Sequence, residues 1–210
     1  AKIQRGVFTD TANARDYSIV NPKKLSPELR MEVCQRCHLQ GNAVLADGKS
    51  FFDFRPGMML NSVMDVYVPR YANDPSFIMA SHADRLKQSK CFVASDGVLE
   101  CTTCHNPHVS VRSTNKNVFN EACQGCHKPQ ACSAPKIELD AQQHQCVNCH
   151  MPVSGTEDIP HVTVHDHKIG KPLTRPAQQA LKTFVGLHAV NNPNPSRTSR
   201  IRAYLQQYER

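Results

Sequence analysis

Eight of the ten cysteines stand in four copies of one pentapeptide, Cys-x-x-Cys-His, at residues 34–38, 101–105, 123–127 and 146–150. The composition of the chain predicts only about 0.02 copies by chance. One helical turn brings both cysteines and the histidine to a common face. Two thiols on such a face can bond to two vinyl groups of a porphyrin while the imidazole binds its iron, and this pentapeptide is the attachment sequence of c-type haem.

The sequence therefore predicts four covalently bound c-type haems. The attaching cysteines are Cys34, Cys37, Cys101, Cys104, Cys123, Cys126, Cys146 and Cys149. The proximal iron ligands are His38, His105, His127 and His150. A zinc ribbon or a thioredoxin-like redox pair is the alternative reading, but zinc takes its cysteines and histidines in sets of four. Neither alternative gives a reason for histidine to follow every second cysteine.

The other histidines are candidates for the second axial position. They are His82, His108, His144, His161, His165, His167 and His188. An iron with two histidine ligands has no open position and tends toward a low potential, which suits electron transfer rather than substrate activation. Four of the seven are enough to fill every iron.

Individual positions narrow the choice of distal ligands. His108 follows His105 too closely to reach the opposite face of the same haem, so it is expected to serve a neighbouring haem. His82 stands among apolar helix positions, where an unsatisfied imidazole is costly. We expect one or two ligands from the group His161, His165 and His167, with His144 in reserve.

Cys91 and Cys132 lie outside the four pentapeptides. In an exported protein the simplest outcome is a disulfide between them, worth roughly 4 kcal/mol by loop closure. Two free thiols are the alternative.

Composition excludes several classes of protein. No apolar run approaches the roughly 18 residues that span a bilayer. The net charge of +7 favours an anionic partner such as nucleic acid, but four ferric haems add about −4 and four ferrous haems about −8, which removes that argument. The chain opens Ala-Lys-Ile-Gln-Arg, without Met or an apolar segment, which predicts a mature exported product.

The elements that must position these residues are expected to be short. Ser26-Pro27 predicts the start of a helix that carries the first pentapeptide at its end. Asp74-Pro75 predicts a second helix with Ile78, His82 and Leu86 near one face. Residues 40–73 read as a long loop.

Beyond residue 93 we expect loops with single helical turns at each motif. Two tail helices, at about 175–186 and 198–208, carry apolar positions that need burial against this core or another subunit. These positions are Leu181, Phe184, Val185, Ile201, Leu205 and Tyr208. The predicted fold class is mostly loop with short α-helices, organised around stacked haems, with little or no β structure. We expect a single domain with an N-terminal arm (1–33), a tetrahaem core (34–170) and a C-terminal arm (171–210).

Several segments resemble a known family. They are 34–41 (Cys-Gln-Arg-Cys-His-Leu-Gln-Gly), 51–57 (Phe-Phe-Asp-Phe-Arg-Pro-Gly), 81–83 (Ser-His-Ala), 89–92 (Ser-Lys-Cys-Phe), 105–108 (His-Asn-Pro-His), 149–152 (Cys-His-Met-Pro), 158–161 (Asp-Ile-Pro-His) and 166–169 (Asp-His-Lys-Ile). Together they resemble exported multihaem cytochromes related to the tetrahaem electron carrier of ammonia oxidisers. With its arms, the whole chain looks like the extracellular nanowire cytochromes of metal-reducing bacteria.

The resemblance implies a distal ligand set of His82, His108, His161 and His167, and it supports the Cys91–Cys132 bridge. It also implies head-to-tail homopolymers in which a subunit can lend an axial histidine to its neighbour. Their partners are upstream periplasmic or outer-membrane cytochromes and an extracellular electron acceptor. We therefore expect an exported electron-transfer protein, not an enzyme, at the extracellular or outer-membrane surface; the alternatives are a soluble periplasmic shuttle, a haem oxidoreductase with one five-coordinate haem, and a structural fibre.

A spectrum of the haem-loaded chain separates the enzyme from the electron carrier. Four irons that each have two histidine ligands give an electron paramagnetic resonance spectrum with low-spin ferric signals alone. A high-spin component equal to one iron per chain would instead identify a five-coordinate haem and favour the oxidoreductase.

Overall fold

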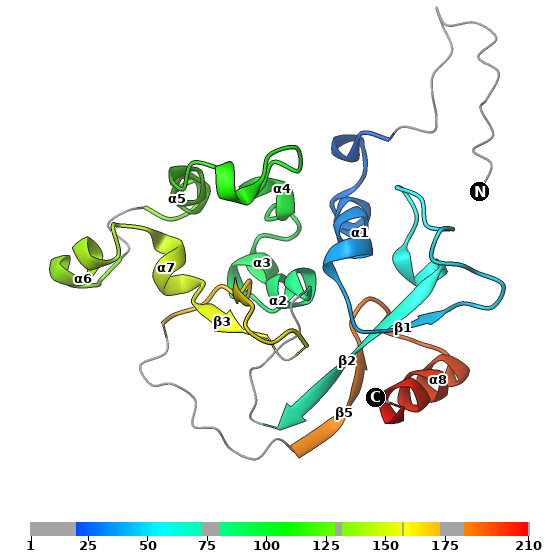
Figure 1. Cartoon of the computed structure of the whole chain (residues 1–210). Coiled ribbons are helices and arrows are strands. Elements are labelled where there is room, and N and C mark those ends of the chain that lie inside the picture. Colours follow the sequence, from blue (N-terminus) through cyan, green and yellow to red (C-terminus); the bar gives the residue numbers. More distant parts are fainter. Residues whose placement is uncertain (1–19, 73–79, 129–131, 157, 173–182, 210) are drawn as a thin grey trace, which may run out of the picture.

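The structure is a computed structural model that describes residues 20–72, 80–128, 132–156, 158–172 and 183–209. Figure 1 shows two groups of elements. A sheet with α1 (Pro27–His38) and α8 (Arg197–Tyr208) lies at one end, and α5 (Asn117–Gln124), α6 (Lys136–Ala141) and α7 (Cys146–His150) lie at the other. Between these groups stand three short helices, α2 (His82–Lys87), α3 (Lys90–Ala94) and α4 (Cys101–Cys104).

The strands form two antiparallel sheets. The larger sheet has the order β1-β2-β5, with β1 (Asn42–Leu45), β2 (Met64–Ala72) and β5 (Thr183–Ala189). The smaller sheet pairs β3 (Val153–Gly155) with β4 (Thr163–His165). Single 3-10 turns occur at η1 (Pro22–Lys24), η2 (Leu60–Ser62) and η3 (Val111–Ser113).

The helix of the first pentapeptide begins where the sequence predicts. The side chain of Ser26 accepts a hydrogen bond from the backbone N–H of Leu29, and Pro27 occupies the first helical position, where its missing N–H costs nothing. Glu28 lies in the first turn, where its charge favours the helix dipole. Helix α1 ends at His38, so it presents the whole pentapeptide in its last turns.

Residues 40–73 are not a long loop, and that expectation is wrong. They contain β1 and β2, and the first five residues of β2, Met64 to Val68, are all buried. Burial on both faces removes the polar–apolar alternation by which a strand is read from sequence. Pro69 also argues against a strand, but it stands beyond the last β1 partner of β2, Tyr67, where the strand has only β5 beside it.

Buried polar contacts hold the C-terminal segment on β2. Asn191 donates to the carbonyl of Met64 at 2.9 Å and accepts from the N–H of Val66 at 2.8 Å. From α8, the Ser199 hydroxyl donates to Asp65 at 2.5 Å and accepts from the Tyr67 hydroxyl at 3.0 Å. The C-terminal segment is therefore built into the same sheet as the residues that follow the first pentapeptide.

Among the described residues, the buried apolar core lies at this end of the molecule and reaches as far as α2. One cluster comprises Met31, Leu39, Leu60, Met64, Val66, Ala83 and Leu86. A second joins Val44 and Tyr67 to Ala203 of α8. Among the described residues between 90 and 172, no residue is fully buried. The segment that carries three of the four pentapeptides thus has no protein core of its own.

Two other predicted helices need correction. The residues from Asp74 to Ile78 lie outside the described part of the chain, and the described helix α2 starts only at His82. Within the predicted tail helix at 175–186, residues 183–186 belong to strand β5, while Leu181 lies outside the described residues. The helix predicted at 198–208 is confirmed as α8.

The predicted fold class is wrong in its main statement. A fold of loops and short helices around stacked haems, with little or no β structure, does not describe this chain, whose described residues form five strands in two antiparallel sheets and include the twelve-residue helices α1 and α8. Beyond residue 93 the motifs do lie on helical turns, but the third begins in the last turn of the eight-residue helix α5, and strands β3, β4 and β5 are also present, so the expectation of loops with single turns is only partly met. None of the helices in the described ranges has the length and apolar character needed to cross a bilayer, as the composition predicted.

Asn191 supplies the test of this sheet. Asn191→Ala removes both of its hydrogen bonds to β2 and leaves a buried N–H and carbonyl without partners, so the free energy of unfolding should fall by about 2–4 kcal/mol. Chemical denaturation of the haem-loaded chain measures this loss. The exposed Asn194→Ala is the control, and equal stability of the two variants would contradict the role given to Asn191.

Candidate functional site

Each pentapeptide forms one helical turn. In the second and third motifs the histidine N–H donates to the carbonyl of the first cysteine, His105 to Cys101 and His127 to Cys123, both at 2.9 Å. The first motif ends α1, and the fourth is α7 itself. All four therefore have the backbone conformation that places two thiols and an imidazole on one side of a turn.

The cysteines of different motifs lie next to one another. A hydrogen bond from Cys101 lowers the pKa of Cys34 to about 7, so the first and second motifs are in contact. Burial, followed by the field of Cys146 and a hydrogen bond with it, raises the pKa of Cys123 to about 11, which places the third motif beside the fourth. The field of Cys104 also reaches Cys123. The four attachment sites thus follow one another in space in their sequence order.

Four histidine rings gather where α1, α2, α4 and the segment after β4 meet. The ring centroids of His38 and His82 are 5.4 Å apart, and those of His82 and His167 are 4.6 Å apart. His167 lies 6.1 Å from His105, with an angle of 30° between the rings. Two expected distal ligands, His82 and His167, are thus brought to two proximal ligands.

The separation of His105 and His167 suits a shared metal ion. With metal–nitrogen bonds of about 2.0–2.1 Å, two imidazoles on opposite sides of one ion have ring centroids about 6 Å apart. Burial lowers the pKa of His82 and of His105, and burial with the nearby His82 lowers the pKa of His167 to about 4. All three rings are therefore neutral near pH 7, which is the form that binds a metal.

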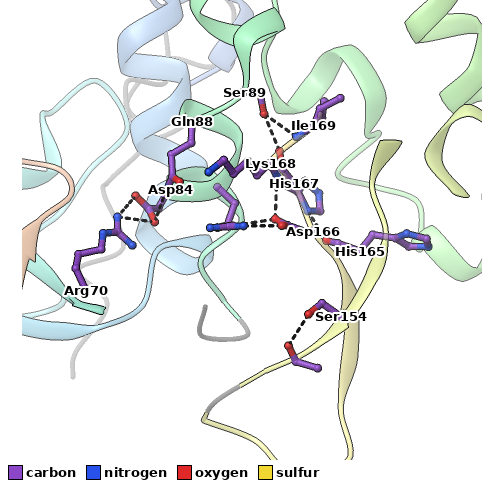
Figure 2. A network of polar contacts seen from close by, with 12 residues as sticks. Arg70, Asp84, Gln88, Ser89, Ser154, His165, Asp166, His167, Lys168 and Ile169 are labelled. Carbon is purple, nitrogen blue, oxygen red and sulfur yellow. Dashed lines mark hydrogen bonds and ion pairs between the residues drawn. The ribbon is translucent and has the colours of Figure 1, made fainter. Parts of the chain in front are cut away.

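An ion pair fixes the segment that carries His167 to the helix that carries His82. Arg85 of α2 donates to both carboxylate oxygens of Asp166, at 2.8 and 2.6 Å, and both side chains are largely buried. Figure 2 shows Asp166 between His165 and His167, with dashed contacts toward α2. A second pair, Arg70 with Asp84 at 2.8 and 3.0 Å, ties α2 in turn to strand β2.

Ser89, which follows α2, also binds the segment that carries His167. Its hydroxyl donates to the carbonyl of His167 at 3.0 Å and accepts from the N–H of Ile169 at 2.8 Å (Figure 2). The backbone that follows His167 is therefore fixed, and the Nδ1–H of His167 donates to the carbonyl of His165 at 2.9 Å. This leaves Nε2 available to bind a metal, the usual arrangement around a ligating histidine.

The second pair of motifs has fewer ordered partners. The Nδ1–H of His150 donates to the carbonyl of Gly170 at 2.8 Å, which again leaves Nε2 available. His165 donates to the carbonyl of Met151 at 2.7 Å. Among the described residues no ring contact joins His127 or His150 to the expected distal ligands His108 and His161, both of which are exposed. These two assignments stay predictions.

The reserve residues are distributed over the molecule. His144 forms an exposed ion pair with Asp140 at 2.9 Å. His188 lies on β5, opposite Val68, and lines a cavity of about 1220 Å³ together with Met31 and Glu100. No ring contact joins His188 to a motif histidine among the described residues.

Cys91 and Cys132 are both free thiols in the structure. The field of Cys91 reaches Cys104 and Cys123, whereas that of Cys132 reaches Cys149. The predicted disulfide is not formed here and stays a prediction.

The residues present fit haem better than a bare metal ion. His82 has a buried Nδ1 without a hydrogen-bond partner in the described part of the chain. Within the described residues no group of three or more His, Cys, Asp or Glu side chains converges as an ion such as zinc requires. A haem needs only two protein ligands to its iron, one from each side, and the pairs His38–His82 and His105–His167 could supply them. The motif cysteines would hold the porphyrin.

The residues that sequence reasoning missed are the positioning groups Arg85, Asp166 and Ser89. A signal for two of them exists, since Asp166 stands between two histidines and Arg85 lies one helical turn after His82. Their mutual contact joins positions 81 residues apart, and no local pattern reports it.

Comparisons with protein-family models, with curated proteins and with solved structures find no match to this chain.

Asp166 tests the junction. Asp166→Ala removes the carboxylate that pairs with the buried Arg85 guanidinium, so the free energy of unfolding should fall by about 3–5 kcal/mol. Because the residue before His167 then loses its ion pair to α2, a fraction of one iron in the haem-loaded chain should also become high-spin in the ferric spectrum.

The control is Asp47→Ala, which breaks an exposed pair with Arg202 and should leave the stability nearly unchanged. If Asp166→Ala keeps the wild-type spectrum while stability falls, the ion pair is structural and does not position His167.

Proposed function

We propose that this chain is an exported tetrahaem cytochrome that passes electrons along four covalently bound c-type haems. The observation that carries the proposal is the succession of the four pentapeptides, each a single helical turn with its cysteines beside those of the next. A haem iron with two imidazole ligands takes up and releases one electron without an open coordination position. Such a series suits conduction rather than catalysis at one centre.

The protein's own contribution is to hold the ligands at fixed positions. His38 and His82 form one candidate axial pair, and His105 and His167 form another. Because the rings of His82 and His167 contact each other, these two pairs are immediate neighbours. Arg85 and Asp166 keep the segments of the two distal histidines together, so the spacing of the first two sites does not depend on flexible side chains.

For the remaining sites we keep His127 and His150 as proximal ligands and His108 and His161 as distal ligands. The supporting observation is the hydrogen bond of His150 to Gly170, which orients its Nε2 away from the backbone. An axial histidine lent by a neighbouring copy would complete a site in the same way.

The proposed setting follows from the resemblance to filament-forming extracellular cytochromes. We place the chain at the extracellular or outer-membrane surface, where it takes electrons from periplasmic or outer-membrane cytochromes and gives them to an external acceptor. Homopolymers would extend the path beyond one chain. A soluble periplasmic shuttle has the same four sites and differs only in staying monomeric.

Carbon monoxide binding tests the axial pairs. The haem-loaded wild-type chain should bind no carbon monoxide, because every iron has two histidine ligands. His82→Ala and His167→Ala should each open one iron, and the double variant should open two, since the two histidines serve different irons. Difference spectra of the reduced chains count the open sites.

His188→Ala is the matched control and should bind none, because His188 belongs to neither of the two proposed axial pairs. If the double variant binds one molecule per chain, both histidines belong to a single iron and the pairing is wrong. Wild-type chain that binds carbon monoxide at one site would favour the oxidoreductase over the electron carrier.

A further inference from the structure

The outer face of α8 is apolar and uncovered by the described part of the chain. Helix α8 packs on the sheet through Ser199 and Ala203. On the other side it exposes a stripe at helical spacing, Ile201, Tyr204, Leu205 and Tyr208, with Leu205 58% and Tyr208 91% exposed. Ile201, Leu205 and Tyr208 are among the apolar positions that the sequence predicts to need burial, and the described residues of the chain do not bury them.

Together with β5 this stripe forms a shallow pocket. Phe184 of β5 packs edge-on against Tyr204, and the pocket of about 680 Å³ is lined further by Ile201, Leu205 and Tyr208. Two arginines, Arg197 and Arg200, stand at its rim in the first turn of α8. Cations there oppose the helix dipole, no acidic residue lies in that turn, and neither arginine has an ion-pair partner within the described ranges. The pocket thus presents an apolar floor and a positive rim.

A complementary feature lies at the opposite end of the molecule. Helix α6 is far from α8 in Figure 1 and exposes Ile137 to 82%. Asp140 lies one turn after Ile137, and Glu138 is beside it, so the isoleucine is flanked by two exposed carboxylates against the single Lys136. The last turn of α6 carries no basic residue.

We infer that the α8–β5 pocket receives helix α6 of a second copy of this chain. Ile137 enters the apolar floor between Phe184, Ile201 and Leu205. The carboxylates of Glu138 and Asp140 face the arginines at the rim. The first turn of α8 thereby gains the negative charge, and the last turn of α6 the positive charge, that its helix dipole favours. The inference rests on the proposed function in one respect, since it names the contact by which electron-transferring copies join.

The two partners of this contact are different surfaces of one chain. A heterologous contact of this kind leaves a free pocket at one end of every assembly and a free α6 at the other, so it continues into a filament unless the rotation closes a ring. In the proposed arrangement α6 neighbours α7, which carries the fourth attachment site, while α8 packs on β1, directly after the first site. The last site of one copy is therefore directed toward the first site of the next.

Complementation between two variants tests this geometry. Ile137→Glu prevents α6 from entering an apolar pocket, and Leu205→Glu places a charge in the pocket itself. Each haem-loaded variant alone should therefore sediment as a monomer. An equimolar mixture should form dimers and nothing longer, because only the intact pocket of one variant and the intact α6 of the other can meet. Val98→Glu, at a site 74% exposed and outside both surfaces, is the control and should assemble like wild type.

A charge exchange tests the rim. Glu138→Arg and Arg200→Glu should each raise the dissociation constant about tenfold or more, and the two together should recover most of the loss. Sedimentation and cryo-electron microscopy measure assembly, and the dimers of the mixture prove that both variants are folded.

The outcomes separate this inference from the proposed function. If Ile137→Glu assembles like wild type, or if the mixture stays monomeric, α6 is not the occupant of the pocket. Wild-type chain that stays monomeric with four low-spin haems would overturn the contact and leave electron transfer standing. A chain that assembles as described but carries no haem would overturn electron transfer and leave the contact.

Discussion

The segment between residues 90 and 172 has no fully buried residue among its described residues, and this constraint governs the rest of the structure. Hydrophobic burial is the main favourable term in folding, and chain entropy opposes it at roughly 1–2 kcal/mol per ordered residue. A segment of this length with so little apolar burial gains little from packing alone. It nevertheless contains six of the eight motif cysteines, spaced so that each pair sits on one helical turn. Covalent attachment of haem at its three motifs is the contribution that would compensate, and folding would then depend on haem attachment as it depends on metal binding in small metal-dependent domains.

The end of the molecule that has a core supplies the fixed frame for this segment. Strand β2 is buried on both faces, and Arg70 at its far part holds Asp84 of α2, while Arg85 of the same helix holds Asp166. Two consecutive residues of one short helix thus connect the sheet to the histidine-bearing segment after β4. Buried ion pairs of this kind contribute little net stability but are costly to break singly. Their effect here is geometric, because they determine where His82 and His167 stand relative to each other.

Features that depend on residues close together in the chain could be predicted from the sequence. These are the turns of the pentapeptides, the capped start of α1 at Ser26 and the helix predicted at 198–208. The sheet was missed because β2 combines buried polar residues such as Asp65 with Pro69, which hide the strand pattern, and because its partner β5 is over a hundred residues away. Of the site, the proximal ligands can be predicted from the pentapeptides alone. Distal ligands depend on long-range contacts, and the structure brings two of the four expected distal ligands, His82 and His167, to proximal histidines.

The sheet that was missed also changes the reading of the C-terminal segment. As a free arm it could bury its apolar positions anywhere, but β5 and α8 are fixed on β2 by Asn191, Ser199 and Ala203. That attachment uses one face of α8 and leaves the other, on a fixed helix, uncovered by the described residues of the chain. A rigid apolar face loses little conformational entropy when it binds, so it suits a permanent contact better than a flexible arm does. The same sheet therefore supports both ends of the proposed conduit, holding the first attachment site on one side through α1 and a preformed docking surface on the other.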